Sequence, residues 1–250
     1  MTATRIARST PEDITVRGRS LPAELMGKLG FTEMAFFHIV GRVPSAGERD
    51  AVDACLVALM EHGLTPSVIA ARLVYSSAPE AVQGAVAAGL CAVGGHFAGT
   101  AEGAARLLTR VAAAADPAAE AARLVGEHRA RREPLPGFGH DLHPEDPRSA
   151  RLFEVARRGG VAGRHVAALE ALSAALDHAL GRHLTINATG AVAAVLLDCG
   201  VPGGIMRGFA LIARCAGLVG HVLEEQRRPA MQAIWDAAQA AVPYEGSDEP

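Results

Sequence analysis

One glycine-rich segment of the sequence contains an imidazole and, a few residues later, a guanidinium. It reads Leu135-Pro136-Gly137-Phe138-Gly139-His140, and Asp146-Pro147-Arg148 follows it. Glycines on either side of an aromatic residue predict a tight turn with little side-chain bulk, where a ligand can approach the backbone closely. The planar donors of an arginine suit carboxylates and phosphates. A glycine turn with an incidental histidine is the alternative interpretation of the same residues.

Two further polar segments lie next to predicted helix ends. His62 follows a helix and precedes the turn Gly63-Leu64-Thr65-Pro66-Ser67, and a histidine at a helix end is often a cap or a partner of the helix dipole. Asn187 and Thr189 precede an apolar helix, where Asn and Thr are ordinary N-cap residues. Taken singly, both segments are typical of helix capping.

One arginine stands inside an otherwise apolar run. Arg214 interrupts the segment Ile212-Ala213-Arg214-Cys215-Ala216-Gly217-Leu218-Val219-Gly220, and a polar run that contains Arg228 follows. A buried arginine requires an anion, because an uncompensated charge in the interior is costly. Among the charged residues of the chain, Arg214 is therefore the one that a purely structural role explains least well.

The elements that position these residues are predicted to be almost all helices. Ala, Leu and Arg dominate the sequence, and alternating stretches are scarce. Only Ile14–Arg17 indicates a strand, within a small N-terminal hairpin. Ser45 and Glu48 occupy capping-box positions. The glycine-rich segments lack the strand that a Rossmann motif requires. Predicted helices cover residues 45–62, 79–90, 101–115, 166–180, 184–198 and 201–225, and a further helix starts at 146.

Composition excludes several classes of function. The 250-residue chain is 50% hydrophobic and carries a formal net charge of −3, so no overall basic field favours nucleic acid. No stretch has the ~20 uninterrupted apolar residues of a spanning helix, so no membrane association is expected. Residues 1–19 lack the apolar segment of a signal peptide. The four cysteines form no CxxC pair and are expected to be buried free thiols. A cytoplasmic location is the resulting prediction.

In this order and spacing, the polar segments resemble the citrate synthase superfamily, from about Arg17 to Pro229. The short length, the His-Gly-Leu-Thr-Pro-Ser segment, the Gln83-Gly84-Ala85 helix and the Gly-Phe-Gly-His-x-Leu-His loop look most like citryl-CoA lyases and the C-terminal module of ATP-citrate lyase. The resemblance implies an all-α, dimeric fold of two subdomains that close over the substrates. The large subdomain would comprise residues 1–100 and 206–250, and the small one 101–205. The implied reaction joins or splits an acyl-CoA and a 2-oxo acid through an enolate.

The resemblance also implies roles for individual residues. His140 corresponds to the histidine that polarises the ketone or holds the alcohol oxygen of the adduct. Arg148 and Arg214 correspond to arginines that bind substrate carboxylates, and Arg228 to one that reaches into the partner subunit's site. The other implied ligand-binding residues are His62, His96, Phe97 and Asn187 for the substrate and Pro136, Gly137, Phe138 and Gly139 for the CoA side. A CoA thioester and a di- or tricarboxylate are the implied ligands, and no metal is predicted.

Two positions depart from the citrate synthase pattern. Citrate synthases proper have a histidine in the glycine-rich break, which assists the enol. Phe97 takes that place here, as in the lyase branch, and His96 lies one residue away. The family's base is an aspartate in an Asn-Val-Asp-Gly segment, and Thr189 replaces it. A hydroxyl is far too weakly acidic to act as a carboxylate near pH 7, and losing a general base costs ~10²–10⁴-fold in rate. Asp141 is the nearest alternative carboxylate in the sequence.

Three functions remain as hypotheses. The first is an enzyme with an altered reaction, in which another group supplies the base or a malonyl-type CoA forms its enolate by losing CO2. The second is a non-catalytic protein that binds CoA or a tricarboxylate as a sensor or partner subunit. The third, a purely structural helical protein, is disfavoured because His140, Arg148 and Arg214 are all present. For each ligand-binding hypothesis we expect a homodimer, built on the Ala/Gly-rich helices from Ser67 to Val93 and on the C-terminal run.

Overall fold

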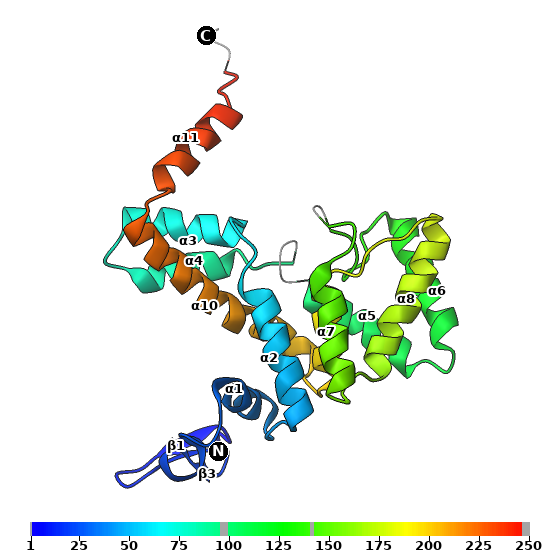
Figure 1. Ribbon diagram of the computed structural model, residues 1–250, viewed down its shortest axis with the longest axis horizontal. Helices are drawn as coiled ribbons and strands as arrows, with labels where there is room; N and C mark the ends of the chain where they lie inside the picture. The colour runs from blue at the N-terminus through cyan, green and yellow to red at the C-terminus, as the bar shows by residue number, and fades with distance from the viewer. Residues whose placement is uncertain (1, 96–99, 141–142, 247–250) are drawn as a thin grey trace. The chain divides into compact units, whose positions relative to one another are not determined.

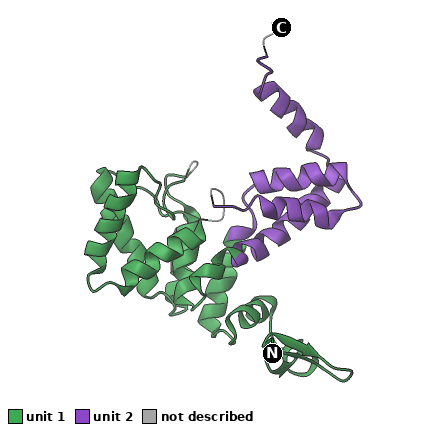
Figure 2. Ribbon diagram, turned by 180° about the vertical axis from the view of Figure 1, so that it is seen from behind, with its two compact units in different colours: residues 1–58, 100–207 green, residues 59–99, 208–250 purple. Residues whose placement is uncertain are grey.

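The computed structural model describes residues 2–95, 100–140 and 143–246 (Figure 1). Most of these residues lie in helices, so the predicted all-α fold is confirmed. The chain divides into two compact units (Figure 2). Unit 1 comprises residues 1–58 and 100–207, and unit 2 comprises residues 59–99 and 208–250. The predicted division differs at the N-terminus, because it groups residues 1–58 with 206–250, whereas the structure groups them with 100–207. That two subdomains close over the substrates stays a prediction.

A small antiparallel sheet begins unit 1, with strands β1 (Ala7–Ser9), β2 (Ile14–Val16) and β3 (Arg19–Ser20) in the order β1-β2-β3. Arg17 and Gly18 join β2 to β3, with φ values of 50° and 82°. Two consecutive residues with positive φ are what a tight hairpin turn requires. The sheet confirms the predicted N-terminal hairpin. A π-helix, Leu21–Leu25, and α1 (Phe31–Val40) follow it.

Helix α2 (Ala46–Met60) starts at the predicted capping box. The Glu48 N–H donates to Ser45 Oγ at 3.2 Å, and the Ser45 N–H donates to Glu48 Oε2 at 2.8 Å. Arg42 adds a paired hydrogen bond to the same carboxylate, which lowers the pKa of Glu48 to about 2. The start of α2 is therefore stabilised by a reciprocal cap and an ion pair.

The core of unit 1 surrounds α9 (Ala188–Asp198). This helix contacts α5 (Ala101–Ala113), α7 (Pro147–Arg158) and α8 (Arg164–Leu180), and α6 (Pro117–Arg131) packs on α8. Eight of the eleven residues of α9 are buried. A helix that is apolar on all sides is stable only in such a position. Helix α9 therefore provides a rigid element at the centre of the unit.

Several predicted helix boundaries are wrong. Helix α9 starts at Ala188 instead of Leu184, because Asn187 caps it and the residues before Asn187 are extended. Helix α4 (Val82–Cys91) starts three residues after the predicted Pro79. Helix α10 (Met206–Arg227) starts after a 3-10 turn, Gly203–Ile205. Three helices have no predicted bounds: α3 (Pro66–Ser77), α6 and α11 (Met231–Ala241).

Unit 2 contains α3, α4, α11 and most of α10. Val68, Ala71 and Leu218 form its small buried cluster. Helices α3 and α4 make the most extensive contact in this unit, whereas α11 has no buried residue and extends away from them (Figure 2). Cys91, at the end of α4, is exposed, and Cys215 of α10 is half-buried, so the prediction of four buried cysteines is wrong at these two positions. Cys55 and Cys199, both in unit 1, are buried as predicted.

Helix α10 is unusually long and apolar. By length and composition, the run Gly203–Arg227 is the one helix within the described ranges that could cross a membrane. Core helices pass the same test, and this run buries Leu218, Val222 and the charged Arg214. Its presence is therefore weak evidence for a membrane, and the expectation of no membrane association stays a prediction.

Close packing of α10 in unit 2 requires glycine at one position and not at another. A Cβ atom at Gly217 would overlap the carbonyl oxygen of Met60, whereas a Cβ at Gly220 would meet no atom within 4 Å. We expect Gly217→Ala to lower the free energy of unfolding by about 1–3 kcal/mol, because the backbone of Met60 must shift. Chemical denaturation of the purified protein measures the change.

Gly220→Ala is the matched control in the same helix. Alanine is favoured over glycine in a helix by about 1 kcal/mol, so this variant should be as stable as the wild type or more stable. If both variants change the free energy of unfolding equally, the backbone of Met60 does not pack against Gly217 as closely as in this structure.

Candidate active site

The loop that contains His140 is docked by its backbone onto the segment before α9. Gly137 and Gly139 have φ values of 96° and 81°, a region that side chains disfavour. The Gly139 N–H donates to the Thr185 carbonyl at 2.9 Å, and Phe138 forms an antiparallel bridge with Ile186. The two segments therefore behave as a short ladder, although about 48 residues separate them in the chain.

A contact between two glycines holds this loop against the first turn of α9. A Cβ atom at Gly190 would lie 2.5 Å from the carbonyl oxygen of Gly137. A Cβ at Gly137 would lie 3.0 Å from the Cα of Gly190 and 3.4 Å from the Cβ of Ala104. Neither position has room for a side chain. The two glycines thus allow the loop predicted to line the CoA side to touch the α9 backbone directly.

Asn187 connects the same two segments. Its Oδ1 accepts the Gly190 N–H at 3.1 Å, and this is the N-cap of α9. Its Nδ2 donates to the Gly139 carbonyl at 2.9 Å, and its backbone N–H donates to the Gly137 carbonyl at 3.1 Å. The structure therefore shows Asn187 as a cap and a tether of the loop. Its predicted role in substrate binding stays a prediction.

The carboxylate of Asp146 is buried at the start of α7, with no exposed side-chain surface. Its Oδ1 accepts hydrogen bonds from the backbone N–H and the Nε of Arg148, both at 3.0 Å. Its Oδ2 accepts hydrogen bonds from Arg148 Nη2 and from the Ala188 N–H, both at 2.9 Å. These four bonds fill the acceptor capacity of a carboxylate. Burial acts to raise the pKa of Asp146, but the hydrogen bonds from Arg148 and Ala188 outweigh it and lower the pKa.

Asp146 thereby fixes the guanidinium of Arg148 beside His140. The Nη2 of Arg148 lies 3.4 Å from Nε2 of His140, and 26% of the Arg148 side chain remains exposed. The backbone N–H of His143 donates to Nδ1 of His140 at 3.2 Å. A neutral imidazole that accepts at Nδ1 carries its proton on Nε2. Arginine can only donate, so a hydrogen bond from Arg148 requires Nε2 to accept instead. The two contacts on the ring therefore require opposite tautomers of a neutral His140, which lies beside a fixed positive charge.

Thr189 lies in the first turn of α9, directly after Ala188, whose N–H is bound by Asp146. It is half-buried, and its hydroxyl makes no hydrogen bond with another residue of the described chain. Within unit 1 the structure thus brings together the predicted site residues His140, Arg148, Asn187, Thr189 and the loop 136–139. Asp141, His96 and Phe97 were also predicted for the site and lie outside the described residues.

Unit 2 carries the other three predicted site residues. Arg214 is buried in α10, with 6% of its surface exposed. His62 is exposed just after α2, and Glu61 Oε1 accepts its backbone N–H at 2.8 Å. Arg228 is exposed directly after α10, and its N–H donates to the Glu224 carbonyl at 2.7 Å. Their roles as ligand-binding residues stay predictions.

Two residues that matter for this geometry have no predicted role. Asp146 belongs to an Asp-Pro-Arg segment, and Asp before Pro is a recognisable helix start. His143 belongs to the same loop as His140, and its ring centroid lies 4.6 Å from that of His140. Its position three residues after His140 is the signal that could have identified it.

Comparison with known proteins identifies the family. Residues 4–235 match the family described as Citrate synthase, C-terminal domain. This chain belongs to the citrate synthase family. A protein of Mycobacterium tuberculosis described as putative citrate synthase 2 is 32% identical over 188 residues, which are 74% of this chain and 49% of that protein. The chain thus spans about half the length of the curated relatives it matches. The predicted resemblance is confirmed.

Solved structures give the same assignment. The citryl-CoA lyase from Hydrogenobacter thermophilus superposes with a TM-score of 0.89 at 30% identity, over 100% of this chain and 96% of that chain. An ATP citrate lyase from Methanothrix soehngenii, in complex with citrate and coenzyme A, gives a TM-score of 0.80 at 20% identity. That match covers 99% of this chain and 42% of that chain and shows the fold alone.

The buried carboxylate of Asp146 makes a pH-dependent contribution to stability. Its pKa is lowered in the folded protein, so its stabilisation is present above the unfolded value of about 3.9 and is lost as pH falls through the lower folded value. We expect Asp146→Asn to lower the free energy of unfolding by about 2–3 kcal/mol at pH 7, since it removes a charge from hydrogen bonds. The deficit should shrink as pH falls below about 4. Denaturant titrations at several pH values measure it.

Asp116→Asn is the matched control, because Asp116 also precedes a proline and caps a helix, α6. Its carboxylate has no arginine partner comparable to Arg148, and Asn is as good an N-cap as Asp. This control should change stability by less than about 0.5 kcal/mol. Equal effects of both substitutions would show that Asp146 acts only as a helix cap.

Proposed function

We propose that this protein binds a CoA thioester together with a citrate-like tricarboxylate. We further propose that it cleaves or forms the carbon–carbon bond between an acyl-CoA and a 2-oxo acid, more slowly than its relatives because Thr189 stands where the family has aspartate. The observation that carries this proposal is the fixed arrangement of His140, on the docked loop, beside Arg148 in the first turn of α7. Likeness to a citryl-CoA lyase over the whole chain supports the lyase direction.

His140 and Arg148 supply two of the groups that such a reaction requires. In the tautomer with its proton on Nε2, the one that the His143 N–H favours, His140 can polarise a ketone or hold the alcohol oxygen of the adduct. Asp146 occupies Nε and one edge of Nη2 of Arg148, which leaves the donors on Nη1 for a ligand carboxylate. Because both side chains are held before a ligand arrives, little ordering is required on binding.

The loop 136–139 is suited to an extended ligand such as the pantetheine arm of CoA. Its glycines expose backbone groups, and its docking on α9 prevents the loop from collapsing into that space. In the structure of an ATP citrate lyase, which shares this fold, citrate and coenzyme A are bound. We place the CoA of this protein along Pro136, Gly137, Phe138 and Gly139.

The missing carboxylate determines which reaction is feasible. Asp146 cannot serve as the base, because all four of its acceptor positions are filled and its pKa is lowered. Thr189 can hold a ligand oxygen or a water molecule but cannot remove an α-proton near pH 7. A malonyl-type donor avoids this requirement, since loss of CO2 forms the enolate directly. The second candidate is a sensor or partner subunit that binds the same ligands without turnover. The lack of a catalytic carboxylate at Thr189 favours this candidate as well.

The proposed assembly is a homodimer in the cytoplasm. Val219 and Leu223 on α10, and Trp235 on α11, are exposed apolar side chains of unit 2. Burying them against a second copy removes apolar surface from water. Arg228, between these helices, would then contribute to the partner's site. The proposed site has no metal requirement.

Replacement of Thr189 tests the proposed reaction. The wild type should bind citrate and CoA in calorimetry and cleave citryl-CoA poorly. We expect Thr189→Asp to raise the rate of citryl-CoA cleavage, because it supplies the missing carboxylate. The rise can be well below the full ~10²–10⁴-fold effect of a general base, since placement within about 1 Å matters. Thr189→Asn is the control, because the asparagine side chain has nearly the shape of aspartate but no carboxylate to act as a base.

Two outcomes would contradict parts of this proposal. A wild-type kcat on the order of 1–10³ s⁻¹ would show that another residue supplies the base, and loss of activity in Asp141→Asn would then identify it. A wild type that binds neither citrate nor CoA would refute the proposed function. Binding of both ligands without turnover of citryl-CoA or a malonyl-type donor would support the sensor hypothesis.

The donor at His140 gives a separate prediction about binding. We expect His140→Ala to weaken citrate binding about tenfold or more, because one hydrogen bond to a charged or polar ligand is lost. The fold should persist, since His140 lies on a loop and is not a core residue. Calorimetry with citrate and circular dichroism measure the two properties. Unchanged affinity for every candidate acid and CoA ester would show that this loop does not bind the ligand.

A further inference from the structure

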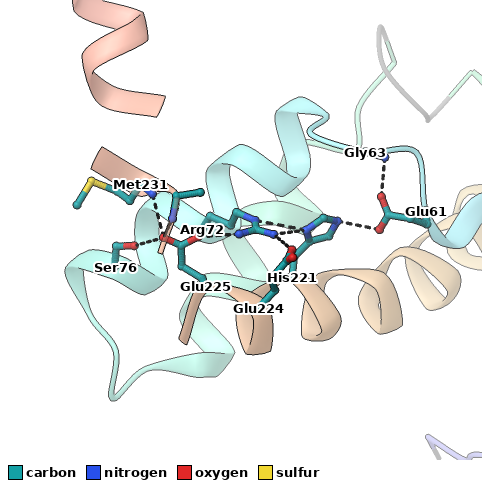
Figure 3. Close-up of polar contacts among 9 residues, drawn as sticks. Glu61, Gly63, Arg72, Ser76, His221, Glu224, Glu225 and Met231 are labelled. Atoms are coloured by element: carbon teal, nitrogen blue, oxygen red, sulfur yellow. Dashed lines mark hydrogen bonds and ion pairs between the residues drawn. The ribbon is translucent and has the colours of Figure 1, made fainter. Parts of the chain in front are cut away.

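Unit 2 contains a polar network, centred on the buried residues Arg72 and Glu225, that the proposed function does not yet use. It comprises Glu61, Arg72, His221, Glu224 and Glu225, with contributions from the backbone at both ends (Figure 3). Arg72 lies in α3, whereas His221, Glu224 and Glu225 lie in α10. Charged residues are rarely buried unless they are paired. A network of this size in a small unit therefore suggests a specific role.

Arg72 is the centre of the network. Its side chain is 4% exposed and that of Glu225 is 1% exposed, and Arg72 Nη1 donates to Glu225 Oε2 at 2.8 Å. A second carboxylate, Glu224, also accepts from Arg72 but is half exposed. Nη2 of Arg72 lies 2.9 Å from Nδ1 of His221. Removing one partner of such a buried pair leaves the other charge uncompensated.

One end of the network caps α11 and shapes the turn before it. Oε1 of Glu225 accepts the backbone N–H groups of Ala230 and Met231, at 2.8 and 2.9 Å, and the Ser76 hydroxyl at 3.2 Å. These bonds tie the start of α11 to the end of α10. The two residues between α10 and Ala230 are Arg228 and Pro229. Glu225 therefore fixes the path of the backbone that presents Arg228.

The other end of the network shapes the turn that contains His62. Oε1 of Glu61 accepts the backbone N–H groups of His62 and Gly63, at 2.8 and 2.6 Å. Oε2 of Glu61 lies 2.8 Å from Nε2 of His221. A carboxylate that accepts two consecutive backbone N–H groups holds the conformation of that turn. Glu61 therefore fixes the backbone that presents His62.

The two ring nitrogens of His221 connect Arg72 at one end of the network to Glu61 at the other. Arginine can only donate, so His221 Nδ1 accepts from Arg72, and the ring proton lies on Nε2 and is donated to Glu61. Each group in the chain of bonds thus has the partner that its chemistry requires. A fully satisfied network of this kind holds its members in one arrangement.

We infer that the Arg72 network is a positioning device that holds the His62 turn and the Arg228 corner in the geometry required to bind a carboxylate ligand. Arg72, His221 and Glu225 are positioning residues, and none of them touches the ligand. The inference rests on the proposed function to the extent that His62 and Arg228 bind substrate. It predicts that a change at His221 alters the backbone at His62, although His221 lies more than 150 residues away in the sequence.

Substitutions at His221 test the inference in the full-length protein, with citrate and CoA as separate probes. His221→Leu breaks the connection, whereas His221→Gln preserves it, because an amide offers one acceptor and one donor. In His221→Leu we expect the amides of His62 and Gly63 to exchange with solvent at least about tenfold faster, and citrate affinity to fall about tenfold. Affinity for CoA should change much less. His221→Gln should restore both properties.

Glu224→Gln is the control, because Glu224 is half exposed and holds neither end of the network. Glu225→Gln should speed amide exchange at Ala230 and Met231. Normal exchange at His62 and Gly63 in a folded His221→Leu protein overturns the inference, and so does a His221→Gln protein that behaves like the leucine variant. If the leucine variant does not fold, His221→Gln and Glu225→Gln decide the question. A wild type that does not bind citrate refutes the proposed function, while the exchange rates still test the network.

Discussion

The direct contact between the backbones of Gly137 and Gly190 is the constraint on which the candidate site depends. Because a Cβ at Gly190 would lie 2.5 Å from the Gly137 carbonyl oxygen, the loop and the first turn of α9 touch without any intervening side chain. Asn187 and Asp146 then complete the assembly, the first by tethering the loop and the second by binding the Ala188 N–H. Helix α9 is the buried centre of unit 1. The loop with His140 and the guanidinium beside it are thereby connected to the most rigid element of the unit.

Hydrogen bonds that backbone N–H groups donate to buried carboxylates hold turns in both units. Asp146 binds the N–H groups of Arg148 and Ala188, and Glu225 binds those of Ala230 and Met231. In each case an arginine neutralises the carboxylate, which makes its burial tolerable. The arrangement holds the proposed ligand-binding groups in place before a ligand arrives, and such preorganisation is what catalysis by positioned donors requires. The proposed replacement of the family's aspartate by Thr189 would therefore remove one chemical group from an otherwise ordered site.

Local patterns predicted much of this structure, whereas long-range pairing did not follow from them. The capping box at Ser45, the glycine turn at 136–139 and the apolar α9 were recognisable because each depends on neighbours in the sequence. The start of α9 was predicted four residues early, since the extended residues before it pair with Phe138 across a long loop. Likewise, the pairing of Arg72 with Glu225 joins residues 153 positions apart, and no local signal in either helix indicates the other.

A crystal structure of the protein with citrate and CoA bound would test the central claim most directly. The account predicts that CoA lies along residues 136–139, that a citrate carboxylate contacts Arg148, and that Nε2 of His140 lies within about 3.2 Å of a citrate oxygen. The hydroxyl of Thr189 should face the bound ligands, and the Asp146–Arg148 pair should be unchanged from the present structure. Ligands bound elsewhere, in contact with neither His140 nor Arg148, would contradict the account.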